Sequence, residues 1–320
     1  MRGALLEELG GVPHPADLPE PVGAPGDIEI EVHAVALNPV DVAVGAGVFH
    51  AGHPPLPYSP AIEAVGRRTD TGSLVYVTGS SRGISRPGTL VATLTAAESD
   101  LTAIPDDADA AAAAALGTAG LAGWLPIRWL ADVRPGESVL VLGATGTAGS
   151  IAVQAARLAG AGRVIAAGRD AAALAALGDV SDATVDLTGE GLAERLASAC
   201  DDGVDVIFDP LWGEPLATAL TVTRPGARIS HVGAAAGPTA TLPSSLVRGR
   251  QLRILGYSNF AVPRDIVNAA YTEMVERSID GSLTISVERS SIDDIAAAWA
   301  RLRAGGSKQV VMFPASGGAS

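Results

Sequence analysis

The stretch Val139 to Arg169, VLVLGATGTAGSIAVQAARLAGAGRVIAAGR, organises the rest of the chain. It opens with a β-branched and leucine run, passes through small residues from Gly143 to Ser150, and continues with helical spacing. It closes on a second apolar run from Arg163 to Ala167. This order predicts a strand, a tight turn, a helix and a second strand.

Small residues occupy the turn in the spacing of a G-x-G-x-x-G fingerprint, with Ala144, Gly146 and Gly149 at its three positions. A dinucleotide site needs small residues there because the backbone must turn tightly and a pyrophosphate must approach the main chain. The helix from about Thr147 would direct its free N–H groups and its positive dipole end at the phosphates. We therefore expect the cofactor phosphates to contact Ala144, Thr145, Gly146, Thr147 and Ala148.

The second strand ends in Gly168 and Arg169, where a carboxylate would bind the ribose 2′-hydroxyl of NADH. An acid at this place would repel a 2′-phosphate, whereas a guanidinium can bind it with two parallel hydrogen bonds. The glycine and the arginine at 168 and 169 therefore favour NADPH over NADH as cofactor. The alternative is that Arg169 caps the next helix or is simply solvated, with Asp170 partly neutralising it.

Composition limits the classes of partner. The chain has 320 residues, 48% of them hydrophobic, which suits two domains with two cores. A formal charge of −13 disfavours nucleic acid or an anionic membrane surface and leaves a small-molecule ligand as the expectation. The single cysteine, Cys200, allows no intramolecular disulfide. Glu7 and Glu8 stand where a signal peptide would be apolar, and no 18 apolar residues run on uninterrupted, so we expect a soluble, cytoplasmic protein without a membrane partner.

Residues 1 to 117 read as a compact β domain. Alternating or β-branched runs predict strands at Asp27 to Leu37, Ser73 to Thr78 and Thr89 to Leu94, separated by loops rich in proline and glycine. The alanine run from Asp107 predicts a helix that ends near Gly117 and joins two domains.

Strands and helices alternate from Gly117 onward, which predicts a doubly wound parallel α/β sheet. We expect strands at 138–142, 163–167, 183–186, 204–209, 227–232 and 252–256, with helices near 147–160, 170–178, 190–200, 213–222 and 243–249. Ligands of such sheets bind outside the carboxyl ends of the strands. Candidate site residues at those ends are Asp209, His231, Val232, Gly233 and Gly256. The tail, with a helix at 263–278, a strand at 283–287, a helix at 292–303 and a strand at 309–313, is expected to return to the first domain.

With these motifs in view, the chain resembles the zinc-independent quinone oxidoreductase branch of the medium-chain dehydrogenase/reductase superfamily. The resemblance rests on EVHAVALNPVD (31–41), PAIEAVG (60–66), RPGESVLVLGATGTAGSIAVQAARL (134–158), VDVIFDPLWG (204–213), ARISHVG (227–233) and GGSKQVVMFP (305–314). It implies a GroES-like β domain over 1–117, completed by 257–320, and a six-stranded Rossmann domain over 118–256, with the nicotinamide in the cleft between them. It also implies NADPH-dependent reduction of a quinone or an α,β-unsaturated carbonyl by a homodimer joined through the edge of the Rossmann sheet.

Residue types argue against the zinc-dependent relatives. Asn38 stands where their first cysteine ligand would be, and Ala61-Ile62-Glu63 replaces their Gly-His-Glu stretch. Zinc needs cysteine or histidine ligands at such positions. We expect no metal.

The resemblance also names catalytic candidates. Asn38, in an N-x-x-D motif with Asp41, would donate a hydrogen bond to the substrate oxygen, although an Asx turn before Pro39 explains it equally well. Asp41 would orient its neighbours. Thr118 corresponds to a threonine beside the nicotinamide, or else to a helix-end residue. Whether Lys308 reaches the cofactor is open.

The segment VAVGAGVF directly after Asp41 contains no tyrosine, whereas some relatives have tyrosines there that can serve as proton donors. Tyr58, Tyr257, His50 and His53 are replacements to consider, and water can also supply the proton. Three functions therefore stay open: a quinone or enone reductase, a biosynthetic reductase acting on one double bond or carbonyl, and a non-catalytic NADPH-binding protein.

Overall fold

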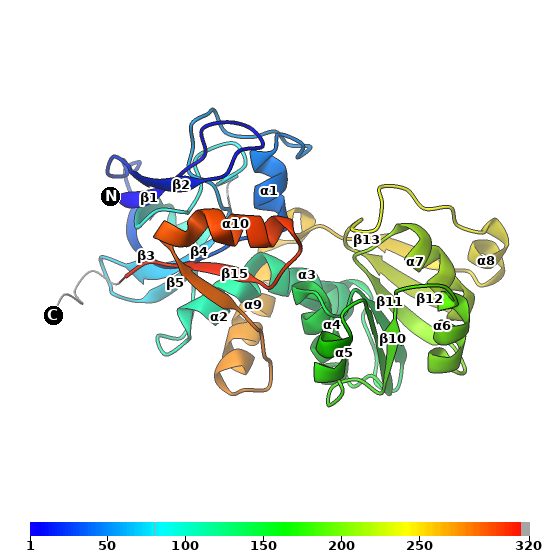
Figure 1. Ribbon diagram of the computed structural model, residues 1–320. Coiled ribbons are helices and arrows are strands. Elements are labelled where there is room, and N and C mark those ends of the chain that lie inside the picture. The colour runs from blue at the N-terminus through cyan, green and yellow to red at the C-terminus, as the bar shows by residue number, and fades with distance from the viewer. Residues whose placement is uncertain (80, 315–320) are drawn as a thin grey trace. The chain divides into compact units, whose positions relative to one another are not determined.

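The computed structural model describes residues 1–79 and 81–314, and the chain divides into two compact units (Figure 1). Unit 1 comprises Met1–Ala119 and Tyr271–Ser320, and unit 2 comprises Gly120–Ala270. The sequence prediction placed the second unit at 118–256, so its carboxyl-terminal boundary differs by 14 residues. Residues after the strand β13 (Arg253–Gly256) stay with unit 2, where the Tyr257 N–H donates to the His231 carbonyl oxygen at 2.9 Å.

Unit 2 is built on a six-stranded parallel sheet, which confirms the predicted doubly wound architecture. The strand order is β10 (Ala183–Asp186), β9 (Arg163–Gly168), β8 (Ser138–Leu142), β11 (Val204–Asp209), β12 (Thr223–His231) and β13 (Arg253–Gly256). The chain thus winds outward from β8 in one direction and from β11 in the other, and these two strands are neighbours at the centre. Ligands bind at such a switch point.

Helices lie on both faces of this sheet, and α4 and α5 lie on one side with α6 and α7 on the other (Figure 1). The helical elements of the unit are α3 (Leu121–Leu125), η3 (Pro126–Leu130), α4 (Thr147–Leu158), α5 (Ala171–Ala176), α6 (Leu192–Cys200), α7 (Gly213–Ala219), η4 (Leu220–Val222), α8 (Ser244–Gly249) and η5 (Asn259–Ala261). The central strand β8 is wholly buried and β11 is buried except at Asp205, which explains their apolar runs in the sequence.

Unit 1 has a larger, mainly antiparallel sheet that joins strands from the first third of the chain to two strands near its carboxyl end. Its order is β14 (Glu288–Ser291), β15 (Gln309–Met312), β3 (Ile28–Ala36), β4 (Ala64–Arg68), β5 (Leu74–Val77) and β7 (Leu101–Ala103), and β6 (Thr93–Ala96) pairs with β3. A hairpin of β1 (Arg2–Leu5) and β2 (His14–Asp17) forms a second sheet. The helical elements are α1 (Pro39–Gly45), η1 (Glu98–Asp100), α2 (Ala110–Ala115), η2 (Leu116–Gly120), η6 (Ile292–Asp294) and α10 (Ile295–Arg303), and α9 (Arg264–Ile279) carries the unit boundary.

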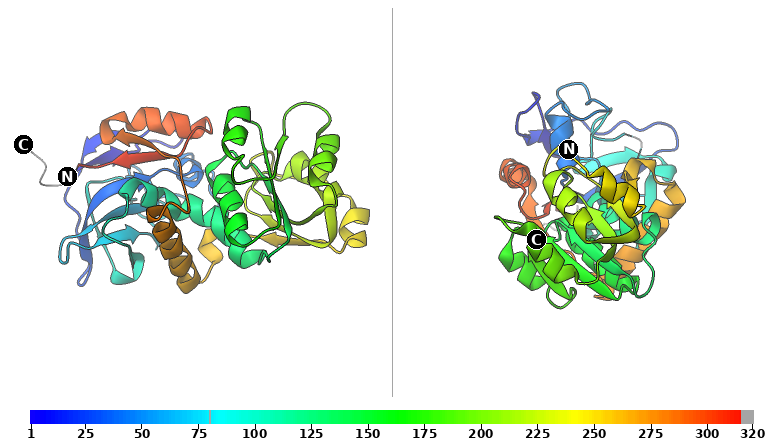
Figure 2. Two further views of the ribbon diagram at one scale, coloured as in Figure 1. Left: turned by 90° about the horizontal axis from the view of Figure 1, so that it is seen from below. Right: turned by 90° about the vertical axis from the view of Figure 1, so that its right-hand side faces the viewer.

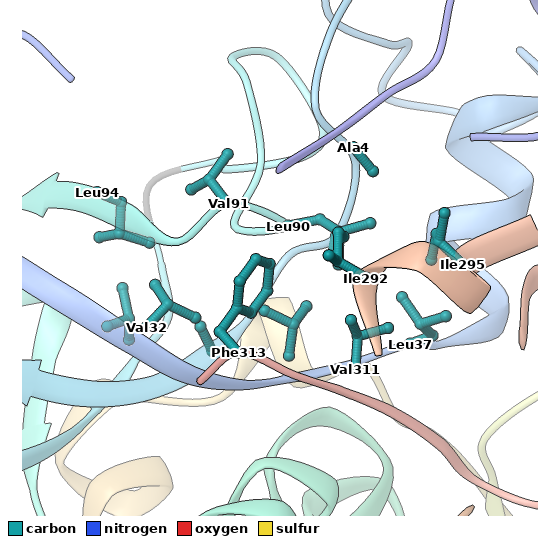
Figure 3. Close-up of a cluster of buried hydrophobic side chains, with 14 of the residues drawn as sticks. Ala4, Val32, Leu37, Leu90, Val91, Leu94, Ile292, Ile295, Val311 and Phe313 are labelled. Carbon is teal, nitrogen blue, oxygen red and sulfur yellow. The ribbon is translucent and has the colours of Figure 1, made fainter. Parts of the chain in front are cut away.

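The apolar core of unit 1 joins segments from both chain ends. Val32 of β3 packs in one cluster with Val311 of β15, Ile292 of η6 and Phe313 (Figure 3). The two further views show the carboxyl-terminal strand and α10 beside the amino-terminal strands (Figure 2). The expectation that the tail completes the first domain is therefore what the topology shows.

Two predicted strands were wrong in position. No strand covers 283–287; the Leu283 N–H donates instead to the Arg277 carbonyl oxygen at the end of α9, and pairing with β15 begins only at Glu288. The N–H groups of residues 89–92 donate to carbonyl oxygens outside the sheet of β6, such as those of Pro60 and Arg2, so that β6 begins at Thr93. In both places other hydrogen bonds replace the ladder that apolar alternation suggested.

The helical turns over Ala110–Leu130 are, by length and composition, apolar enough to cross a membrane, and 72% of the apolar window is buried within the protein. The predicted helix end near Gly117 is a break, since Gly117 has a non-helical ψ of −116°, but helical turns resume beyond it. Before the break α2 packs on β3 and β4, and after it α3 packs on α4. Each half is thus a core element of its own unit.

Candidate functional site

The glycine-rich turn between β8 and α4 has the geometry that its sequence predicts. Gly143 has a φ of +64°, and a side chain at Gly149 would collide with the Gly143 carbonyl oxygen. Gly146, by contrast, is exposed, and the nearest atom to an added Cβ would be 3.5 Å away. Gly149 therefore lets α4 approach the strand closely, while Gly146 leaves room for a ligand against the backbone.

The amino terminus of α4 begins at Thr147, directly after Gly146, and no side chain caps it. The N–H groups of its first turn, including those of Thr147 and Ala148, have no partner within an α-helix. Ala144 is buried and its N–H donates to the Ala167 carbonyl oxygen at 2.9 Å, so it shapes the turn from within. Together with Thr145, this arrangement fits a pyrophosphate.

Arg169 and Asp170 follow β9 and have different roles. The Asp170 carboxylate caps α5 by accepting from the N–H groups of Ala172 at 2.9 Å and Ala173 at 3.0 Å. Arg169 is exposed and makes no hydrogen bond or ion pair with the residues that the structure describes. Gly168 is buried against Thr145, whose Cγ2 would lie 2.5 Å from an added Cβ. A guanidinium thus stands free beside the turn, and the neighbouring carboxylate is bound to backbone.

The other candidates of unit 2 gather at the carboxyl ends of β11, β12 and β13. The Val232 N–H donates to the Asp209 carbonyl oxygen at 2.8 Å, and the Asp209 carboxylate lies 3.0 Å from Nδ1 of His231. Gly233 lies close to the Pro210 carbonyl oxygen, and Gly256 is exposed at the end of β13. These residues share the edge of the sheet that carries the glycine-rich turn.

In unit 1, a buried polar cluster centres on Glu63. Its Oε2 accepts hydrogen bonds from the Tyr76 hydroxyl at 2.6 Å, from the Thr118 N–H at 2.6 Å and from Thr118 Oγ1 at 2.7 Å. Its Oε1 accepts from Nδ2 of Asn38 at 2.7 Å. Burial and the nearby Glu63 carboxylate raise the pKa of Tyr76 well above its usual value, which keeps the phenol a donor. Glu63 is therefore fully engaged by neutral donors and one cation.

That cation is Lys308, which precedes β15. Its ammonium donates to Oδ1 of Asn38 at 2.6 Å and to the Leu37 carbonyl oxygen at 3.0 Å, and it lies 4.0 Å from the Glu63 carboxylate. Burial lowers the pKa of Lys308, while Glu63 and Asp41 act in the opposite direction. Because an ammonium can only donate, it also determines which way the Asn38 amide is turned.

Asp41, the second residue of the N-x-x-D motif, stands at the start of α1. One carboxylate oxygen accepts from the Asn38 N–H at 2.7 Å, and the other, Oδ1, is buried without a hydrogen-bond partner among the described residues. Burial raises the pKa of Asp41 to about 7, against the lowering effect of the bond from Asn38. The residue caps α1 and orients Asn38, as expected of a structural neighbour.

The structure thus brings Asn38, Asp41 and Thr118 together but gives Asn38 no free donor. One amide hydrogen bonds Glu63 and the other lies 3.3 Å from the Ala36 carbonyl oxygen. A direct bond from Asn38 to a substrate stays a prediction and would require one of these contacts to be given up. Tyr257 belongs to unit 2, where its hydroxyl lies 2.6 Å from Oδ1 of Asn259 and burial raises its pKa.

Sequence reasoning missed Glu63 and Tyr76 as members of this cluster. The signal was an acid inside the apolar segment PAIEAVG, since a buried carboxylate must find donors. Tyr76 gave no such signal, because a tyrosine in a strand is an ordinary core residue.

The donor set around Asn38 does not fit a catalytic zinc. It offers an amide and the carboxylates of Glu63 and Asp41, and a buried ammonium already lies beside the amide and Glu63. A second cation would be repelled there, and zinc prefers thiolate and imidazole ligands. Over 1–79 and 81–314, no group of three His, Cys, Asp or Glu side chains could hold a metal ion.

Comparison with known proteins agrees with this architecture. A family model described as zinc-binding dehydrogenase matches residues 148–280. Quinone oxidoreductase-like protein 2 of Mus musculus is 27% identical over 243 residues, which are 74% of this chain and 69% of that protein. A phenolphthiocerol synthesis polyketide synthase, type I Pks15/1 of Mycobacterium marinum, is 31% identical over 236 residues, 72% of this chain and 11% of its own length.

Among solved structures, the quinone oxidoreductase of Thermus thermophilus, also determined in complex with NADPH, is 26% identical with a TM-score of 0.82. The match covers 98% of this chain and 100% of that one. A parallel six-stranded sheet with a glycine-rich turn, together with a separate antiparallel unit, defines a two-domain dinucleotide-binding oxidoreductase fold. The chain is similar to members of the medium-chain dehydrogenase/reductase superfamily, and quinone oxidoreductases are among these relatives.

Proposed function

We propose that this chain is an NADPH-dependent reductase of quinones or α,β-unsaturated carbonyl compounds and that it works without zinc. The observation that carries the proposal is the exposed Arg169 at the end of β9, beside an Asp170 carboxylate that is bound to α5. A 2′-phosphate at this place meets a guanidinium and no free acid.

The residues of unit 2 would bind and orient the cofactor. The first turn of α4 and the open backbone at Gly146 would hold the pyrophosphate, and Arg169 would hold the 2′-phosphate. When bound, the cofactor supplies hydride chemistry. The protein would contribute position and the exclusion of water.

The acceptor class follows from the polar cluster of unit 1. An unactivated ketone needs a Lewis acid or a strong proton donor as it accepts hydride, and the Asn38–Lys308–Glu63 cluster does not fit zinc. Quinones and enones delocalise the charge that they acquire and have less need of such help. The relative from Thermus thermophilus, a quinone oxidoreductase, supports this choice.

A reductase confined to one biosynthetic substrate is the second candidate. The similarity to part of a polyketide synthase, at 31% identity, is the observation that favours it. Such an enzyme would turn over one bulky enone much faster than it turns over generic quinones.

NADPH oxidation followed by its absorbance would test the proposal, with a panel of 1,4-quinones and cyclic and linear enones against NADPH and NADH. We expect turnover with NADPH, little with NADH, and no loss after dialysis against a chelator. Tight NADPH binding without turnover of any acceptor would instead identify a non-catalytic NADPH-binding protein.

A further inference from the structure

A histidine and a buried carboxylate form a close pair at the ligand edge of unit 2. Nδ1 of His231, at the end of β12, lies 3.0 Å from Oδ2 of Asp209, at the end of β11. The Asp209 side chain is completely buried, whereas 27% of the His231 side chain is exposed. One ring nitrogen therefore faces the protein interior and the other is left for a ligand.

Asp209 is fixed by the chain around it. Its Oδ1 accepts from the N–H groups of Leu211 at 3.0 Å and Trp212 at 2.9 Å. Burial raises the pKa of Asp209, and these two bonds together with His231 oppose the rise by favouring the carboxylate. A carboxylate at this distance holds the proton of His231 on Nδ1 and steadies the imidazolium when it forms.

Trp212 holds the imidazole from a second direction. The two ring centroids are 4.1 Å apart with planes inclined by 42°. Trp212 has φ +58° and ψ −162°, a region that non-glycine residues almost never occupy. Backbone strain of this kind persists where the surrounding structure imposes it, and it clusters at functional sites.

The topology places this pair in the second half of the dinucleotide site. In the order β10-β9-β8-β11-β12-β13, the adenosine half belongs to β8, β9 and β10, with Arg169 at its end. The other half belongs to β11, β12 and β13, and His231 is at the carboxyl end of its middle strand. The Tyr257 hydroxyl at the neighbouring strand end is engaged with Asn259, so His231 is the titratable side chain that this edge leaves available.

We propose that His231 is the proton donor of the reaction, with Asp209 and Trp212 as the residues that position it. The inference rests on the proposed function. Reduction of an enone or quinone moves a hydride, with two electrons, from the cofactor to the acceptor and leaves an enolate or hydroquinone anion. Nε2 of the imidazolium would give its proton to that anion, and solvent would then protonate the neutral imidazole again. The sum is one hydride and one proton added to the acceptor and one oxidised cofactor released.

The decisive variant is His231→Gln, compared with His14→Gln on the exposed strand β2 as a matched control. We expect His231→Gln to lower kcat at neutral pH by about 10²-fold, within the range typical of general acid catalysis, and to leave the Kd of NADPH unchanged. Because Nε2 of His231 would supply the proton, the kcat of the wild type should depend on pH, and that dependence should be absent in His231→Gln.

A second variant and a spectroscopic readout test the positioning role. Asp209→Asn should lower kcat, because the carboxylate that orients the imidazole through Nδ1 is then missing. Nitrogen-15 spectra of labelled histidine should show the proton of neutral His231 on Nδ1; the signal among the five histidines is assigned by its loss in His231→Gln. If Asp209→Asn does not fold, the His231→Gln variant and the spectra of the wild type still test the proposal.

An unchanged kcat and pH profile in His231→Gln would overturn this inference alone. A raised Kd for NADPH with an unchanged kcat would do the same and would make His231 a cofactor contact. If the wild type turned over no quinone or enone with NADPH, the proposed function would fail first and the inference with it.

Discussion

Arg169 and Asp170 show how two adjacent residues can have separate tasks. The Asp170 carboxylate accepts hydrogen bonds from the first turn of α5. It therefore neutralises the Arg169 guanidinium less than the adjacency of the two residues in the sequence suggests. The alternative in which Arg169 caps that helix is not what the structure shows, because Asp170 is the cap.

Replacing Arg169 with alanine should weaken NADPH binding selectively. Losing hydrogen bonds between charged groups costs about 1.5–3 kcal/mol, so we expect the Kd of NADPH to rise about 10- to 100-fold with the Kd of NADH unchanged. Calorimetric titration of both cofactors would measure this, with the exposed Arg248→Ala on α8 as control. Equal weakening of both cofactors would show that Arg169 does not read the 2′-phosphate.

Asp41 predicts a dependence of stability on pH. Its pKa is about 7 in the folded protein because of burial, above the ordinary value of 3.8. Between these values the folded state holds a proton that the unfolded state has lost, so this group's contribution makes stability fall as pH rises, by roughly 1.4 kcal/mol per pH unit. In Asp41→Asn that contribution should be absent. Urea unfolding at about pH 5 and about pH 7, the window between the two pKa values, measures the difference, and parallel curves for variant and wild type would contradict it.

The turn between β8 and α4 combines two requirements in one short element. Gly149 is a packing residue, since a side chain there would meet the Gly143 carbonyl oxygen. Gly146 has room on the protein side, so its smallness is needed only for a ligand. The glycine-rich motif therefore requires glycine at these two positions for two different physical reasons.

Alanine substitutions at the two glycines should separate these reasons. Gly149→Ala should destabilise unit 2 by more than about 1 kcal/mol, because the clash is with backbone that cannot move freely. Gly146→Ala should fold normally, since its φ of −84° suits alanine, and should weaken NADPH binding about 10-fold. Thermal unfolding and fluorescence titration give the two readouts. A normal Tm for Gly149→Ala would refute the packing argument.

Unit 1 depends on contacts between distant parts of the whole chain. Lys308 near the carboxyl terminus joins Leu37 and Asn38 after β3 to Glu63 before β4. Every member of this cluster is buried, so the loss of one leaves another without compensation.

Lys308→Met should destabilise the protein by about 3–5 kcal/mol, because the Glu63 carboxylate would remain buried without its cation. Adding Glu63→Gln should restore part of this loss, since Tyr76 and Thr118 can still donate to the amide oxygen. The Asn38 amide, no longer held by Lys308, can turn its oxygen toward the amide N–H of the glutamine. Urea unfolding of both single variants and the double variant measures the coupling. Strictly additive losses would mean that the two side chains do not interact.

The proposed homodimer can also be tested. β13 ends the sheet of unit 2, and Ile254 on it is 38% exposed. We propose the homodimer that the resemblance implies, formed through this edge, and expect Ile254→Asp to shift a dimer to monomer in sedimentation experiments because it places a charge in an apolar contact. Thr184→Asp on β10, the opposite edge, is the control and should leave the dimer intact. Dimers in both variants would exclude this edge as the interface.

The sequence by itself determined the parallel sheet, its glycine-rich turn and the place of Arg169 directly after β9. Those features depend on short-range periodicity and on residues within one strand-turn-helix unit. The tertiary structure decided what could not be read along the chain: the clustering of Glu63, Tyr76, Thr118 and Lys308, the pairing of Asp209 with His231, and the strand that begins at Glu288 and not at Leu283. The physical reason is that buried polar groups and edge strands pair with whichever groups lie near them in space. Which groups lie near one another is decided only when the sheets have formed.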